Sequence, residues 1–147
     1  MRIIVKNIFE DIDKLDYIGI TTNSTLNSKG HLVMGAGNAK QAKDLCPILP
    51  KVFGDKIKKT TGNLNFYGIL KYYNYFAFQT KLNWKDNSPL WVVEKSIDQL
   101  LEISLKHSDK QFGLPFPAIN HGGLSIDVVK PLLEKLPDNV TIYKLPN

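Results

Sequence analysis

The sequence has very little cysteine and no run of apolar residues long enough to cross a membrane. Cys46 is the only cysteine among 147 residues, which excludes an internal disulfide and favours a reducing compartment such as the cytoplasm. A membrane span needs about 20 apolar residues, and the apolar stretch after Met1 is also too short for a secretory signal peptide. No cysteine and histidine cluster has the spacing of metal ligands, so neither a metal nor another cofactor is expected.

The composition is that of an ordinary globular protein with a modest positive charge. Hydrophobic residues make up 43% of the chain and charged residues 22%, and the length predicts one domain, residues 1–147, with one sizeable core. The net charge of +5 favours an anionic ligand. The lysines are spread along the chain without a basic amphipathic run, so nucleic acid is expected only as a modified substrate. We expect a monomer with no membrane partner.

A pair of glycines opens the most informative stretch, residues 32–44. Gly35 and Gly37 precede residues that favour a helix. Glycine lets a ligand approach the backbone closely, and the helix would begin with unpaired N–H groups at the positive end of its dipole. This arrangement is typical of a phosphate site. The stretch lacks the third glycine of the dinucleotide fingerprint and the ending of a P-loop, so the alternative is a tight turn before an ordinary helix.

The pattern of apolar residues predicts strands that alternate with helices. Strands are predicted at 2–5, 17–22, 63–70, 73–79, 112–116 and 140–145, and helices at 38–45, 49–57, 89–107 and after Ser125. Residues 11–14 are predicted to form a polar turn, and a second turn is predicted near Lys71. Trp84 and Trp91 are expected to pack a helix against the sheet. This order of elements predicts an α/β domain with three layers, α/β/α.

A second glycine pair, Gly122 and Gly123, also follows a predicted strand and precedes a predicted helix. Ligands of open α/β sheets bind beyond the carboxyl ends of the strands. Two loops that present backbone N–H groups from opposite sides of such a crevice would suit a diphosphate.

Taken together, these motifs resemble those of a macrodomain, the fold that binds ADP-ribose. The chain looks most similar to a phage and bacterial branch, grouped with macrodomains that remove ADP-ribose from glutamate or DNA thymidine. The matching stretches are Ile20-Thr-Thr-Asn23, residues 32–41, Phe78-Gln-Thr-Lys-Leu-Asn-Trp84, and Leu114-Pro-Phe-Pro followed by Gly122-Gly-Leu124. The resemblance implies a three-layer α/β/α macrodomain-like fold with a mixed central sheet. It also implies a cytoplasmic protein, in the host cytoplasm if a phage encodes it.

The resemblance implies a set of site residues as well. Asn23 matches the asparagine that faces the distal ribose, and Lys81 matches the catalytic lysine of the branch that cleaves ADP-ribosyl bonds. Asn7 stands where the family often has an aspartate that receives the adenine amino group. The implied catalytic residues are Lys81, His121 and Asn23, and the implied ligand-binding residues are Asn7, Ile8, Asn23, Met34, Gly35, Ala36, Gly37, Asn38, Ala118, Ile119, Asn120, His121, Gly122, Gly123, Leu124 and Tyr143.

The second loop departs from the family pattern. Where the family has Gly-Cys-Gly-Asn, this chain has Ala118-Ile-Asn-His121, and the partner aspartate of the glutamate-deconjugating relatives falls at Gly122. Asn120 tolerates a positive φ, so the shape of the loop is expected to survive. His121 is either an acid–base group, since imidazole exchanges protons near neutral pH, or a loop side chain in water.

Two functions therefore stay open. One is an enzyme that hydrolyses an ADP-ribosyl bond to protein or DNA, or ADP-ribose 1″-phosphate. The other is a module that binds ADP-ribose, or a related nucleotide signal, without catalysis. Lys81 and His121 favour the enzyme, whereas the altered loop favours the binding module. Without the resemblance, the interpretation of Lys81 is a solvated lysine at a strand end. A lysine becomes a catalytic group only when it is desolvated or coupled to another charge.

Overall fold

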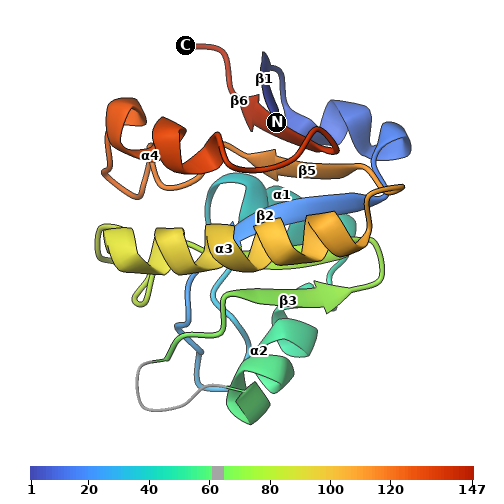
Figure 1. The fold of residues 1–147 in the computed structure, drawn as a ribbon. Coiled ribbons are helices and arrows are strands. Elements are labelled where there is room, and N and C mark those ends of the chain that lie inside the picture. The colour runs from blue at the N-terminus through green and yellow to red at the C-terminus, as the bar shows by residue number, and fades with distance from the viewer. Residues whose placement is uncertain (61–64) are drawn as a thin grey trace.

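A six-stranded sheet between two layers of helices forms the core of the computed structural model, which describes residues 1–60 and 65–147 (Figure 1). The strands are β1 (Arg2–Val5), β2 (Tyr17–Thr22), β3 (Ile69–Tyr72), β4 (Tyr75–Gln79), β5 (Phe112–Pro115) and β6 (Val140–Lys144). Their order across the sheet is β1-β6-β5-β2-β4-β3. Neighbouring strands are parallel, except that β3 runs antiparallel to β4. The sheet is therefore mixed.

Each face of the sheet is covered by its own helices. The helices are η1 (Ile8–Lys14, a 3-10 helix), α1 (Gly37–Leu45), α2 (Leu49–Thr60), α3 (Leu90–Lys106) and α4 (Ile126–Leu133). Ile20 and Phe53 are buried on the face of η1, α1 and α2, whereas Phe78 and Leu114 are buried on the face of α3 and α4. The two cores arise because alternate residues of a strand point to opposite faces. This arrangement confirms the predicted three layers.

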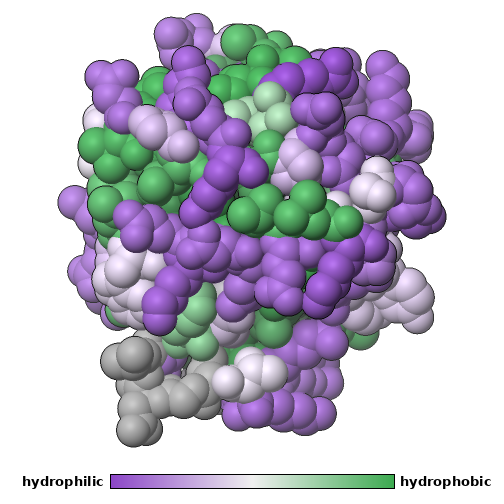
Figure 2. Space-filling model, in the orientation of Figure 1, coloured by the Kyte–Doolittle hydropathy of each residue, from purple (hydrophilic) through white to green (hydrophobic). Residues whose placement is uncertain are grey.

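The outer side of α3 and α4 is mostly hydrophilic, with hydrophobic side chains gathered near α4 (Figure 2). Ile126 and Val128 of α4 are exposed. Of the helices within the described residues, none is long and apolar enough to cross a membrane.

Two predicted connections differ in the structure. The polar turn at residues 11–14 belongs to η1, because Asn7 and Glu10 form a capping box at its start. The turn predicted near Lys71 lies at residues 73–74, where β3 ends at Tyr72 and β4 begins at Tyr75. Residues 63 and 64 of the predicted strand lie outside the described residues.

The end of α3 is fixed by one buried side chain. Asn139 Nδ2 donates to the carbonyls of Ser104, His107 and Lys110, at 3.1, 3.1 and 3.0 Å. These carbonyls belong to the last turn of α3 and the connection that follows, where helices leave backbone acceptors unpaired. Asn139 therefore joins the end of α3 to the start of β6.

We expect the Asn139→Ala variant to lose about 1–3 kcal/mol of the free energy of unfolding, because one buried and two partly buried carbonyls lose their donor. Urea denaturation at neutral pH measures the loss. Asn147→Ala removes an exposed asparagine and is the matched control. Equal stability of the two variants would show that the Asn139 side chain does not hold α3.

Candidate functional site

The predicted site residues lie along one edge of the sheet, in the order of the strands. The carboxyl ends of the five parallel strands meet at this edge, because the strands run in the same direction. Asn7 follows β1, residues 118–124 follow β5, Asn23 and the first glycine pair follow β2, and Lys81 follows β4. Since β1 and β4 lie on opposite sides of β5 and β2 in the sheet, the two glycine loops stand between Asn7 and Lys81.

The first glycine loop leads directly into α1. The first hydrogen bond of this helix is donated by Lys40 N–H to the Ala36 carbonyl at 3.2 Å. The amides of residues 37–39 therefore precede the hydrogen-bond ladder of the helix. A Cβ built at Gly35 or Gly37 would meet no atom within 4 Å, and Gly37 has a φ of +58°. The loop offers open backbone donors at the positive end of the helix dipole.

The Asn38 side chain faces the sheet. Its Oδ1 accepts from the Thr21 N–H at 3.3 Å and from the Thr21 hydroxyl at 2.9 Å. Its Nδ2 donates to the Gly19 carbonyl at 3.1 Å. Asn38 thus anchors the start of α1 to β2, and its contribution to a ligand would be its backbone amide.

The second glycine loop is held by one hydrogen bond within the loop and by another to the segment before α3. Leu124 N–H donates to the Ala118 carbonyl at 3.0 Å, and Ser88 N–H donates to the Gly122 carbonyl at 2.8 Å. A Cβ at Gly122 would lie 2.4 Å from the Ala118 carbonyl oxygen and 2.5 Å from Ser88 Oγ. The positive φ values of this loop are at Ala118 (+68°) and Gly123 (+76°), rather than at Asn120.

The remaining predicted ligand residues divide into exposed and buried side chains. His121 and Asn120 are exposed. Ile119 and Leu124 pack partly against the core beneath α3 and α4. The side chains of Ile8, Met34, Ala118 and Tyr143 are buried. A ligand at this edge would therefore meet the buried residues mainly through their backbone, and His121 through its imidazole.

Asn23 and Lys81 follow neighbouring strands, and their backbones run side by side. The Thr22 carbonyl accepts from both the Thr80 and the Lys81 N–H, at 2.9 and 3.2 Å. Asn23 Nδ2 donates to the Val33 carbonyl at 3.1 Å, and its Oδ1 accepts from the Thr25 N–H at 2.8 Å. These bonds leave one Nδ2 proton and one Oδ1 lone pair of Asn23 for a ligand.

The Lys81 side chain lies in a loop with an exposed tryptophan. Its Nζ donates to the Trp84 carbonyl at 3.3 Å, which engages one of its three protons. Trp84 is 49% exposed, and Lys85 Nζ lies 5.6 Å from the centre of its ring. Trp91 is also exposed, at the start of α3, 5.6 Å from the Phe66 ring. The prediction that both tryptophans pack a helix against the sheet was wrong.

A buried carboxylate, Asp11, lies close to the end of β1, and nothing in the sequence indicated its role. Asp11 Oδ1 accepts from Lys6 Nζ at 2.6 Å, and Oδ2 accepts from the Tyr143 hydroxyl at 2.9 Å. The Lys6 ammonium and the Tyr143 hydroxyl lower the pKa of the Asp11 carboxyl, and burial raises the pKa of the Tyr143 hydroxyl. Tyr143 is only 4% exposed, so its ring supports the site from below.

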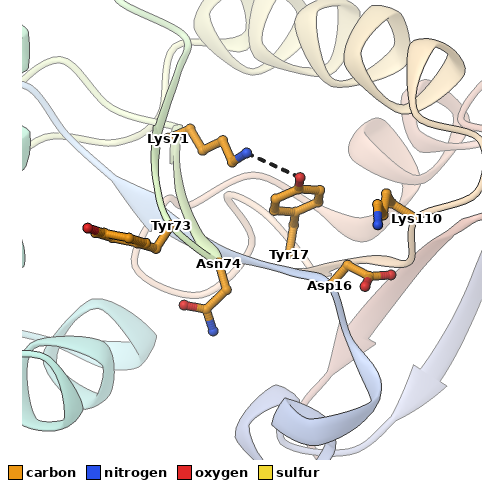
Figure 3. Close-up of a pocket in the computed structure, with 6 residues that line it drawn as sticks. All are labelled: Asp16, Tyr17, Lys71, Tyr73, Asn74 and Lys110. Carbon is orange, nitrogen blue, oxygen red and sulfur yellow. Dashed lines mark hydrogen bonds between the residues drawn. The ribbon is translucent and has the colours of Figure 1, made fainter.

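A separate hollow lies at the opposite edge of the sheet, near the start of β2 (Figure 3). It is lined by Asp16, Tyr17, Lys71, Tyr73, Asn74 and Lys110. Two of its charged groups have partners: Lys71 Nζ donates to the Tyr17 hydroxyl at 3.1 Å, and Asp16 Oδ2 accepts from the Gln111 N–H at 2.7 Å. It contains none of the predicted site residues and is not part of the candidate site.

Within residues 1–60 and 65–147, no group of three His, Cys, Asp or Glu side chains could hold a metal ion. No family model matches the sequence, and no curated protein matches it significantly.

Solved structures resemble the whole chain. DarTG of Thermosipho africanus, in complex with ADP-ribose, matches 98% of this chain with a TM-score of 0.77 and 25% identity, and the chain spans 41% of that protein. The macrodomain of Thermus aquaticus DarG matches 99% of this chain and 97% of its own length, with a TM-score of 0.78 and 23% identity. The macrodomain of Mycobacterium tuberculosis DarG matches 90% of each chain, with a TM-score of 0.69 and 19% identity.

The Asp11 ion pair predicts a pH dependence of stability. A carboxyl whose pKa is lower in the folded than in the unfolded chain stabilises the fold above the unfolded value, and this stabilisation is lost as the pH falls through the folded value. We expect the parent protein to lose stability as the pH falls below about 4, and Asp11→Asn to flatten this part of the profile. Urea denaturation across acidic pH measures both, with the exposed Asp13→Asn as control. Parallel profiles for parent and Asp11→Asn would contradict the coupling.

Proposed function

Because this chain has the macrodomain fold, we propose that it binds ADP-ribose along the carboxyl edge of its sheet and hydrolyses an ADP-ribosyl bond. The order of groups along that edge carries the proposal. Asn7 follows β1 at one end, the two glycine loops and Asn23 follow β5 and β2 in the middle, and Lys81 follows β4 beside Asn23 at the other end. Adenine, diphosphate and distal ribose follow the same order in ADP-ribose. The likeness to DarTG, whose structure holds ADP-ribose, supports this placement.

The diphosphate would be held mainly by backbone donors. The start of α1 follows β2 and the second glycine loop follows the neighbouring strand β5, so the amides of both lie at the middle of the edge. A hydrogen bond to a charged group contributes about 1.5–3 kcal/mol. The helix dipole and the net charge of +5 add attraction for a dianion.

Changing Gly37 to valine should abolish this binding. The valine side chain would occupy the open space next to the loop, where the phosphate approaches, and would be strained at a φ of +58°. Calorimetry with ADP-ribose measures the loss, which we expect to exceed tenfold (about 1.4 kcal/mol). Tyr73→Val is the matched control, because Tyr73 has a φ of +53° in a turn at the opposite edge.

The binding proposal fails if the parent protein gives no heat with ADP-ribose up to about 1 mM, an affinity near −4 kcal/mol. Binding of unchanged strength by Gly37→Val would show instead that the diphosphate does not lie against α1.

We assign the chemistry to Lys81. With the distal ribose held by Asn23, the Lys81 amine would attack the anomeric carbon and displace the attached group, after which water cleaves the new bond to the lysine. Alternatively, Lys81 as an ammonium would protonate the leaving atom while water adds to that carbon. Holding the reacting groups together can supply several kcal/mol of the barrier. His121 would shuttle protons, since its imidazole is exposed in the adjoining loop.

Lys81→Ala should lower turnover by about a hundredfold or more, the usual scale for a removed acid–base group, with little change in ADP-ribose affinity. His121→Ala should lose less. The assay uses ADP-ribosylated DNA, ADP-ribosylated protein and ADP-ribose 1″-phosphate. Lys85→Ala is the control, because Lys85 belongs to the same loop and its amine lies over Trp84. Full activity of Lys81→Ala on a substrate that the parent cleaves would move the chemistry to His121 or to a bound water.

A binding module without catalysis is the second candidate. The crowding at Gly122 favours it, because no acidic side chain fits where the glutamate-deconjugating relatives carry their partner aspartate. A parent protein that binds ADP-ribose and cleaves none of the three substrates would decide for this candidate.

A further inference from the structure

A buried tyrosine lies beneath the Asn23 and Lys81 end of the edge. Tyr67 is 7% exposed, and its hydroxyl donates to the Asn23 carbonyl at 2.6 Å. The Thr22 hydroxyl lies 2.5 Å from the same phenolic oxygen. A phenol has one proton, which here goes to the carbonyl, so the Thr22 hydroxyl is the donor to Tyr67. The Tyr67 hydroxyl therefore holds the backbone at the point where β2 ends.

The same tyrosine is tied to the backbone at Lys81. Tyr67 N–H donates to Gln79 Oε1 at 2.8 Å, and Gln79 Nε2 donates to the Lys81 carbonyl at 3.0 Å. Gln79 is fully buried. A continuous chain of hydrogen bonds thus runs from the Asn23 backbone through Tyr67 and Gln79 to the Lys81 backbone.

The Tyr67 hydroxyl is a permanent donor. Burial raises the pKa of this phenol, and the hydrogen bond from Thr22 offsets only part of that rise. The phenol therefore stays neutral and keeps donating its proton to the Asn23 carbonyl over the whole physiological pH range.

We infer that Tyr67 is a positioning residue for the distal ribose. Its hydroxyl fixes the Asn23 backbone, and with it the direction in which the free Nδ2 proton and Oδ1 lone pair of Asn23 point. The inference rests on the proposed function. It adds a specific consequence: Tyr67 acts on the ribose end of the ligand and not on the adenine or the diphosphate, because its hydroxyl contacts the Asn23 carbonyl and the Thr22 hydroxyl rather than either glycine loop.

ADP provides the test, because it has the adenosine and the diphosphate but no distal ribose. We expect Tyr67→Phe to bind ADP-ribose about tenfold more weakly than the parent, the scale of one lost hydrogen bond. Its affinity for ADP should not change. Calorimetry measures both ligands, with ADP at millimolar concentrations. Tyr75→Phe is the matched control, since Tyr75 is a buried tyrosine on the same face of the sheet.

Thr22→Val is a second variant that leaves the bond from Tyr67 to Asn23 in place. It should weaken ADP-ribose binding less than Tyr67→Phe, again without effect on ADP. Equal loss of ADP and ADP-ribose affinity in Tyr67→Phe would show a general structural role and overturn the inference, as would unchanged affinity for both. A parent protein that binds neither ligand would overturn the proposed function itself and the inference with it.

Discussion

The side-chain amide of Gln79 determines how the chain is arranged at the end of β4. Its Oε1 accepts from the N–H groups of Tyr67 and Gly68, at 2.8 and 3.2 Å. Its Nε2 donates to the carbonyls of Asn65 and Lys81, both at 3.0 Å. A buried amide left without partners costs about 1–3 kcal/mol. The segment before β3 therefore stays packed against Gln79, and the backbone at Lys81 is held at the end of β4 by the same side chain.

The sequence predicted the layers of the fold because the pattern of apolar residues is local. Each strand and helix shows its period within its own segment. The positions of the turns were harder to predict from the sequence than the strands and helices. The capping box of Asn7 and Glu10 lies in a short acidic segment that looks like a turn, and the tight turn at residues 73–74 places a tyrosine at positive φ, where glycine or asparagine is usual.

Backbone elements of the candidate site were visible in the sequence, whereas side-chain networks were not. A glycine pair before a helix is typical of an anion site, although the same pattern also fits a tight turn before an ordinary helix. By contrast, Tyr143 and Asp11 are separated by 132 positions, and Tyr67 and Asn23 by 44. No spacing rule joins such distant residues, and only the tertiary packing of the folded chain brings them together. The buried hydrogen bonds that hold the site residues in place are therefore the part of the site that the sequence predicts least well.

The crowding at Gly122 has a consequence for redesigning the second loop by substitution. An aspartate introduced there would strike the Ala118 carbonyl oxygen and Ser88 Oγ, which belong to two different connections. An acidic side chain at this position therefore requires both connections to rearrange together. His121 is exposed in the same loop, so a new acid–base group fits at that position without such a rearrangement.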